Sequence, residues 1–138
     1  MSFLLHPRLE ADTITIGSLA LSQLLLINDS RFPWLVLVPR RNGAREMIDL
    51  DQADQVQLFN EMQTVLKAVS IAFKPDKLNL GAIGNLVPQL HVHIIARFEK
   101  DAAWPSPVWG FGNSEPYSLA DLSLRKTAIS SHFTFFPD

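Results

Sequence analysis

The sequence predicts a single α+β domain with an antiparallel sheet of about five strands, one long helix and a short C-terminal helix. Candidate strands gather in runs on either side of one long helical segment, whereas a doubly wound fold would need strands and helices that alternate. The length of 138 residues suits one domain, and 47% apolar residues suffice for one sizeable core. We therefore treat residues 1–138 as one unit.

Composition excludes several classes of protein. The absence of cysteine rules out a disulfide framework and a thiolate zinc site. A net charge of −2 argues against an extended surface for macromolecular nucleic acid but leaves small anions open. The N-terminal apolar run, Phe3 to Leu5, is too short for a signal peptide, and the longest apolar stretches are too short to cross a bilayer. We therefore expect a soluble cytoplasmic protein without a membrane partner.

Three of the predicted strands lie before residue 40. Residues 12–17 alternate polar and β-branched side chains, which is typical of a half-buried strand. Residues 21–27 form a second apolar run, and the turn cluster Asn28-Asp29-Ser30 follows it. Residues 34–38 are apolar on both faces and lie between two prolines, which predicts a buried strand.

The segment from Asp49 to Pro75 is the clearest helix in the sequence. Asp49 or Asp51 can cap its start and suits the positive end of the helix dipole, and Pro75 ends it. A last helix is predicted from a cap at Ser118 to about residue 130. The long helix carries apolar residues at three- and four-residue steps, which predicts one buried stripe: Leu58, Met62, Val65, Leu66, Val69 and Phe73.

Two strands follow the long helix, residues 77–83 and 89–98, and the second carries two of the four histidines in the stretch QLHVHIIARF. Because alternate residues of a strand face the same side, Gln89, His91 and His93 share one face. The apolar residues between them share the other face, which we expect to pack against the long helix. The two imidazoles are then expected on the uncovered face of the sheet.

The paired histidines allow three interpretations. They are two surface residues, or two ligands of a metal ion, or groups for acid–base and nucleophilic chemistry, since imidazole titrates close to neutrality. A metal site needs a third ligand, yet His6 and His132 lie far away in the sequence and no carboxylate has suitable spacing.

The segment that precedes the second of these strands, NLGAIGNLVPQ, favours imidazole chemistry. It contains Gly81, Gly84 and the side-chain amides of Asn79 and Asn85. Glycine lets the backbone approach a ligand closely, and exposed N–H groups bind anionic oxygens. The sequence therefore predicts a phosphate group beside an imidazole.

At these residues the sequence resembles the histidine triad (HIT) family of nucleotide hydrolases and transferases. The family signature is H-φ-H-φ-H-φ-φ, in which φ is apolar, and residues 89–95 read QLHVHII. The second and third histidines and every apolar position match. The stretch LLINDSRFPWLVLVPRR is similar to the strand–turn–strand of the family, and Trp104-Pro105 resembles an element of one branch. The matching pieces run from about residue 20 to 110.

The resemblance implies a HIT-like fold and a role for each matching residue. His91, at the middle position, would be the nucleophile that attacks the α-phosphorus and forms a nucleotidyl-histidine. His93, at the last position, would contact the phosphate and assist the leaving group. Asn85 would contact the phosphate, and Asn28, with Asp29 as second choice, would hold the ribose hydroxyls. The resemblance also implies a homodimer. The chemistry requires no metal cofactor, although a polyphosphate substrate can bring Mg²⁺.

Two residues depart from the family pattern. Gln89 replaces the first histidine, and Trp34 lies where many members carry a further histidine of a network behind the nucleophile. Gln89 still offers a donor and an acceptor, and its backbone carbonyl could orient the His91 ring, so we count it among the candidate substrate-binding residues. The leading hypothesis is an enzyme that cleaves a nucleoside phosphoanhydride or phosphoramidate. The alternatives are a nucleotide-binding regulatory module with little catalysis and, last, a metal-dependent hydrolase.

Other residues receive simpler predictions. Trp34 is expected to pack in the core or at a dimer interface. Trp104 and Trp109 are expected either to cover an apolar patch near the site or to meet a second subunit. Arg97 is expected to be a charge at a strand end, and His6 a surface or capping residue.

Overall fold

The computed structural model describes residues 2–137 and contains one five-stranded sheet in the order β1-β2-β3-β5-β4, with every neighbouring pair antiparallel. The α+β fold predicted from the sequence is confirmed, including its long helix and its short C-terminal helix. The strands are β1 (Thr13–Ser18), β2 (Ser22–Ile27), β3 (Trp34–Pro39), β4 (Lys77–Gly81) and β5 (Val92–Arg97).

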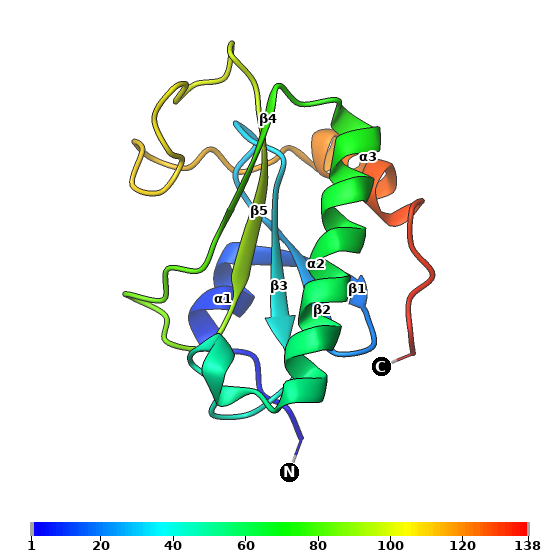
Figure 1. The fold of residues 1–138 in the computed structure, drawn as a ribbon. Coiled ribbons are helices and arrows are strands. Elements are labelled where there is room, and N and C mark those ends of the chain that lie inside the picture. The colour runs from blue at the N-terminus through cyan, green and yellow to red at the C-terminus, as the bar shows by residue number, and fades with distance from the viewer. Residues whose placement is uncertain (1, 138) are drawn as a thin grey trace.

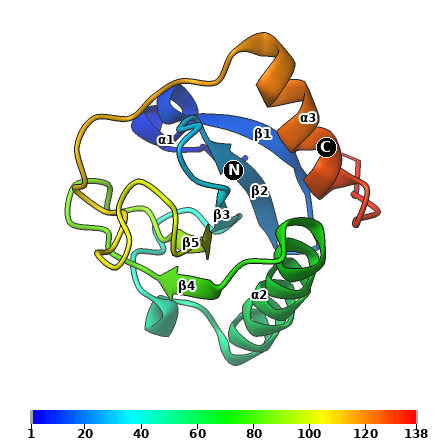
Figure 2. The same cartoon turned by 90° about the horizontal axis from the view of Figure 1, so that it is seen from above.

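Figure 1 and the view from above in Figure 2 show how the helices are placed around the sheet. The long helix α2 (Gln52–Phe73) lies along one face, and α3 (Leu119–Ser130) lies beside α2 and the edge strand β1. On the other side lie α1 (Pro7–Asp12) and the long segment between β5 and α3. The sheet is therefore covered by a regular helix on one face and mostly by irregular chain on the other.

The helix α2 begins and ends as its sequence predicts. The side chain of Asp51 accepts a hydrogen bond from the backbone N–H of Asp54 at 2.8 Å, and Lys74 ends the helix in the left-handed region with φ of 49°. Asp49 lies instead in the short 3₁₀ helix η1 (Met47–Asp49). The buried stripe of α2 packs on a set of aliphatic residues that we call the helix-side core; among its members are Leu24, Leu35, Leu37, Leu58, Met62, Val65, Val69, Val92 and Ile94.

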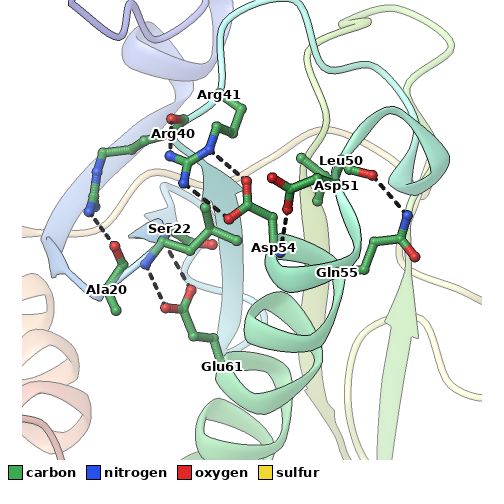
Figure 3. Close-up of polar contacts among 10 residues, drawn as sticks. Ala20, Ser22, Arg40, Arg41, Leu50, Asp51, Asp54, Gln55 and Glu61 are labelled. Atoms are coloured by element: carbon green, nitrogen blue, oxygen red, sulfur yellow. Dashed lines mark hydrogen bonds and ion pairs between the residues drawn. The ribbon is translucent and has the colours of Figure 1, made fainter.

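A buried carboxylate also ties α2 to the sheet. Glu61 accepts hydrogen bonds from the backbone N–H groups of Leu21 and Ser22, at 2.7 and 3.0 Å (Figure 3). It also accepts one from the side chain of Gln57 at 3.0 Å. These contacts hold the turn between β1 and β2 against the middle of the helix. The carboxylate is buried but has hydrogen-bond donors around it, as a buried charge requires.

The prediction that the histidine face of the sheet is uncovered is wrong. His91 and His93 are only 7% and 6% exposed, because α1 and the segment between β5 and α3 cover this face. A second apolar cluster, which we call the histidine-side core, forms beneath the cover: Leu9, Leu25, Phe32, Trp34, Val36, Val38, Val87, Ile95, Ala103 and Val108. The helix α1 was not predicted, since its six residues are too few to show a periodic pattern.

The strand that carries the histidines is shorter than predicted. It begins at Val92 rather than residue 89, because the backbone N–H of Leu90 bonds to the carbonyl of Ala44 outside the sheet. His91 therefore lies immediately before β5. His93 lies inside the sheet, opposite Val36 of β3 and Gly81 of β4.

Candidate active site

A cavity of about 550 Å³ lies beside the paired histidines. It is lined by His91 and His93, by Asn28 and Asp29 from the turn after β2, and by Trp34 at the start of β3, with further walls from α1 and residues 108–116. A larger cavity of about 890 Å³ lies between α3 and residues 98–101, but no histidine lines it. We assign the site to the smaller cavity because both imidazoles line it.

His91 has one ring nitrogen fixed by the backbone. Its Nδ1 lies 2.6 Å from the carbonyl oxygen of Gln89. A carbonyl oxygen only accepts hydrogen bonds, so Nδ1 carries the proton and donates it. The other ring nitrogen, Nε2, then keeps its lone pair, which is the state that a nucleophile needs. The predicted role of the Gln89 carbonyl in orienting this ring is confirmed.

His93 is fixed in the opposite tautomer. The indole Nε1–H of Trp34 donates to Nδ1 of His93 at 2.9 Å. Because an indole can only donate, Nδ1 must hold the lone pair and the neutral ring carries its proton on Nε2. Burial, and next the positive charge that His91 can carry, lower the pKa of His93 to about 3. At neutral pH, His93 is therefore an uncharged hydrogen-bond donor.

Trp109 packs over His93 within the same chain. Its ring lies edge-on to that of His93, with centroids 5.4 Å apart, and edge-on to that of Trp34 at 6.5 Å. It also lies over Gly81, where an added Cβ would approach the indole to 3.1 Å. Of the two predictions for this residue, the cover over the site is the one that the structure confirms. Trp104, in contrast, is 36% exposed.

Asn28 and Asp29 both line the cavity, but their side chains are restrained to different degrees. Asn28 is half-buried, and its side-chain oxygen accepts from the N–H of Tyr117 at 3.0 Å. Asp29 is 1% exposed and pairs with Arg31 at 2.8 Å. Burial raises the pKa of Asp29, but hydrogen bonds from Arg31 and from the backbone of Arg31 and Glu115 hold it below its usual value. Asp29 is thus held in place by its ion pair, whereas Asn28 stays partly accessible at the cavity.

Gln89 and Asn85 are not brought into this cavity. The Gln89 side chain accepts from the N–H of His6 at 2.8 Å and donates to the carbonyl of Leu4 at 2.9 Å, so it ties down the N-terminal segment. His6 caps α1 through its Nδ1, as a capping residue would. Asn85 is exposed and does not line the cavity. The glycine loop does reach His91, since Gly84, with φ of +71°, lines a recess of about 20 Å³ together with that histidine.

Arg97 has a larger role than the charge at a strand end that was predicted. Its guanidinium is 2% exposed, pairs with Asp101 at 2.8 Å, and donates to Asn79 at 2.9 Å and to the carbonyl of Ser106 at 2.8 Å. Burial raises the pKa of Asp101, but hydrogen bonds from Arg97 and three backbone N–H groups outweigh it and lower the pKa to about 2. This ion pair fixes the start of the segment that covers the histidines.

Two further properties bear on the interpretations left open by the sequence. Within residues 2–137, no group of three or more His, Cys, Asp or Glu side chains is placed to hold a metal ion. In the same part of the chain, no helix has the length and apolar character needed to span a bilayer.

A five-stranded antiparallel sheet, a long covering helix and a His-x-His pair at a cavity define a histidine-triad type of domain. In agreement, the sequence profile of the HIT domain matches residues 8–100, and the chain belongs to the HIT family. A search of curated proteins finds no significant match.

Solved structures of histidine triad proteins from three bacteria cover nearly the whole chain. A protein from Bradyrhizobium japonicum has 49% sequence identity and a TM-score of 0.94, over 96% of this chain and 98% of that chain. One from Sinorhizobium meliloti 1021 has 45% identity and a TM-score of 0.92, over 95% and 97%. One from Marinobacter aquaeolei VT8 has 40% identity and a TM-score of 0.93, over 96% of each chain.

Proposed function

We propose that this protein is a nucleotide hydrolase or transferase that cleaves a nucleoside phosphoanhydride or phosphoramidate at the α-phosphate through a covalent intermediate on His91. The observation that carries the proposal is the 2.6 Å contact between His91 Nδ1 and the Gln89 carbonyl. It leaves the lone pair of Nε2 available on a ring that lines the cavity. Membership of the HIT family supports nucleotide binding at this position.

In the first step, the Nε2 lone pair of His91 attacks the α-phosphorus. A P–N bond forms, the bond to the leaving group breaks, and the leaving group takes the electron pair. The Gln89 carbonyl, which accepts the Nδ1–H bond, stabilises the positive charge on the nucleotidyl-imidazole. In the second step, the oxygen of water or of another acceptor attacks phosphorus and displaces Nε2. The identity of that acceptor decides between hydrolase and transferase.

The remaining roles follow from position. Asn28 lies in the cavity wall and is proposed to hold the ribose. The loop of Gly84 and Asn85 is proposed to offer N–H groups to the phosphate, supported by the recess that Gly84 shares with His91. The reaction needs no resident metal in this scheme, and Mg²⁺ can arrive with a polyphosphate.

A homodimer and a cytoplasmic location are also proposals. Trp109 no longer supports the dimer, since its ring is used within the protomer. Support comes instead from apolar side chains that α2, β4 and the loop after β4 leave exposed, among them Phe59, Leu80 and Leu86.

The test is to replace His91 with Ala and follow a nucleotide labelled at the α-phosphate. Quenching in alkaline denaturant should trap an acid-labile adduct on the unchanged protein. The variant should lose the adduct and at least about 10³-fold of turnover, since its nucleophile is gone. His132→Ala is the matched control, because His132 is exposed at the far end of the chain. An adduct that persists in His91→Ala would contradict the proposal.

One observation favours the alternative of a nucleotide-binding module with little catalysis. The Gln89 side chain, at the position of a family histidine, holds the N-terminal segment and does not contact His91 through a side-chain hydrogen bond. A panel of dinucleoside polyphosphates, nucleoside phosphoramidates and nucleotide sugars, run with and without EDTA, separates the two. Binding without turnover of any substrate would establish the module.

A further inference from the structure

Trp34 and His93 form a hydrogen-bonded pair across two strands of the sheet. Trp34 opens β3 and His93 lies in β5, and the two strands are antiparallel neighbours. The indole Nε1–H donates to His93 Nδ1 at 2.9 Å, and the ring centroids lie 5.7 Å apart. Both side chains are buried, which limits competition from water for this bond.

This bond works against the charged form of His93. An imidazolium carries N–H groups at both ring nitrogens, which would place an N–H of His93 against the N–H of Trp34. An indole has no lone pair in its plane with which to accept, so two donors would face each other at 2.9 Å in a buried site. The neutral ring with its proton on Nε2 is the form that satisfies both residues.

The surrounding charges do not reverse this preference. His91 is the titratable neighbour, with its ring centroid 4.9 Å away, and any charge on it would oppose a second one. The two carboxylates of the cavity wall already have cations: Asp12 of α1 pairs with Arg8, and Asp29 pairs with Arg31. Trp109 closes the remaining side with an aromatic edge. In keeping with this environment, the pKa of His93 lies near 3.

We propose that Trp34 is a specificity-determining residue, which restricts this site to nucleotides whose leaving group departs as an anion, such as a phosphate or polyphosphate, and disfavours amine leaving groups. This inference rests on the proposed function. When a P–O bond to phosphate breaks, oxygen takes the electron pair and the product is stable near neutrality. When a P–N bond breaks, nitrogen takes the pair and must gain a proton. His91 has spent its lone pair on phosphorus, and neutral His93 has no proton of suitable acidity to give.

The substitution Trp34→His tests the inference, because a second imidazole can accept a hydrogen bond from a protonated His93. The first measurement is the ¹⁵N NMR signature of the His93 ring between pH 5 and 8. The unchanged protein should show one neutral tautomer, with the lone pair on Nδ1, throughout this range. Trp34→His should show a ring that titrates within the range. An unchanged protein whose His93 is protonated at Nδ1, or charged at pH 5.5, would overturn the proposal.

The second measurement is the ratio of kcat/KM for a dinucleoside polyphosphate to that for the corresponding nucleoside 5′-phosphoramidate of an alkylamine. A general acid contributes about 10²–10⁴-fold, so the unchanged protein should prefer the phosphoanhydride by about 10²-fold or more. Trp34→His should reduce the ratio by at least about tenfold, mainly through faster phosphoramidate cleavage. A ratio that does not change although the His93 tautomer does would overturn the role of Trp34.

Two further variants serve as a control for Trp34→His and as a substitute for it. Trp104→Phe is the matched control, since Trp104 does not line the cavity, and it should alter neither the NMR signature nor the ratio. If Trp34→His does not fold, Trp34→Phe removes the N–H donor together with the five-membered ring of the indole. At acid pH its phosphoramidate rate should exceed that of the unchanged protein, because His93 can take a proton at Nδ1 once the N–H of Trp34 no longer faces it. Equal rates in the two proteins at acid pH would overturn the proposal.

Failure of the proposed function and failure of the selectivity give different experimental results. If neither substrate is turned over while His93 shows the expected tautomer, the proposed function and the selectivity fall together, and the Trp34–His93 pair remains as a structural feature. If both are turned over at similar kcat/KM, the proposed function stands and the selectivity fails.

Discussion

The two faces of the sheet are covered in different ways. On the helix-side core, one regular helix lays a stripe of aliphatic residues on the strands, and Glu61 is the buried acidic residue of that helix. On the histidine-side core, aromatic rings, two imidazoles and the Asp29–Arg31 pair come from β3, from β5 and from the chain just before each of them, and α1 and the segment after β5 cover them. The Arg97–Asp101 pair joins β5 to that segment. One face mainly stabilises the fold, and the other holds the polar groups of the site.

Backbone hydrogen bonding explains the difference. A helix satisfies its own N–H and C=O groups, whereas an irregular segment over a sheet needs outside partners. Here carboxylates supply them. Asp101 accepts from the backbone N–H groups of Phe98, Ala103 and Trp104, at 3.0, 3.0 and 2.8 Å. Asp29 accepts in the same way from the N–H of Glu115 at 3.3 Å. On this face, buried carboxylates satisfy backbone N–H groups that regular secondary structure would otherwise satisfy.

The largest effect is expected from removing one of these charges. Asp101→Asn keeps the shape of the side chain but leaves the Arg97 guanidinium buried without its counter-charge. We expect a loss of about 3–5 kcal/mol in the free energy of unfolding, as for other broken buried ion pairs. Urea denaturation measures the loss, and nucleotide binding should weaken with it, because the segment that covers the histidines loses its anchor.

The matched control is Asp12→Asn, which removes an exposed ion pair. The side chains of Arg8 and Asp12 are 62% and 59% exposed, so this change should cost at most about 1 kcal/mol. Equal losses for Asp101→Asn and Asp12→Asn would show that the histidine face does not depend on buried charge.

An intermediate effect is expected from acid. The folded protein keeps His93 neutral down to a pKa of about 3, whereas the unfolded chain takes up a proton below about 6.5. The unfolded state therefore binds more protons in this window, and the free energy of unfolding falls as the pH falls, by about 1.4 kcal/mol per pH unit. Between pH 6.5 and 5 the expected loss is about 1.6 kcal/mol, because the unfolded histidine is already half protonated at pH 6.5.

Chemical denaturation across this range measures the slope. His93→Gln, whose side-chain oxygen can still accept from Trp34, should flatten it. His132→Gln, at an exposed position, should leave it as it is. A slope that persists in His93→Gln would assign the acid sensitivity to other groups.

The smallest effect on the site is expected from a change on the helix face. Glu61→Gln keeps one oxygen, which can accept from the N–H group of Leu21 or of Ser22. Its amide NH₂ then faces the other N–H group. We expect a loss of about 1–3 kcal/mol in the free energy of unfolding, the cost of leaving one buried donor unsatisfied. Nucleotide affinity, followed by calorimetry, should stay unchanged. A variant that loses affinity without losing stability would mean that the two faces are coupled.

The sequence predicted the elements whose signals are local. Alternation predicted the first strand, continuous apolar runs predicted the next two, and the cap at Asp51 with the three- and four-residue spacing predicted α2. The shared face of His91 and His93 and the role of the Gln89 carbonyl followed from strand geometry and the short separation in the chain.

Features that depend on distant residues were missed. The bond between Trp34 and His93 joins positions 59 residues apart, and it exists because β3 pairs with β5. The cover over the histidines depends on Arg97 and Asp29, whose partners have no periodic pattern around them. The sequence does contain one signal for this cover. Arg97 ends an apolar strand and Asp101 follows four residues later, and this spacing suggests a buried ion pair as readily as an exposed charge.

The two carboxylate anchors have an evolutionary consequence. Asp101 fixes one end of the segment that covers the histidines, and Asp29 fixes the other near Glu115. The residues between these anchors are mostly exposed and carry no strand of the sheet. Insertions, deletions and substitutions at the exposed positions there can accumulate without disturbing the register of the strands, provided that Ala103, Val108 and Trp109 keep their packing on the histidine face. Descendants of one ancestral scaffold could thus acquire new substrate preferences by varying the exposed positions between Asp101 and Glu115.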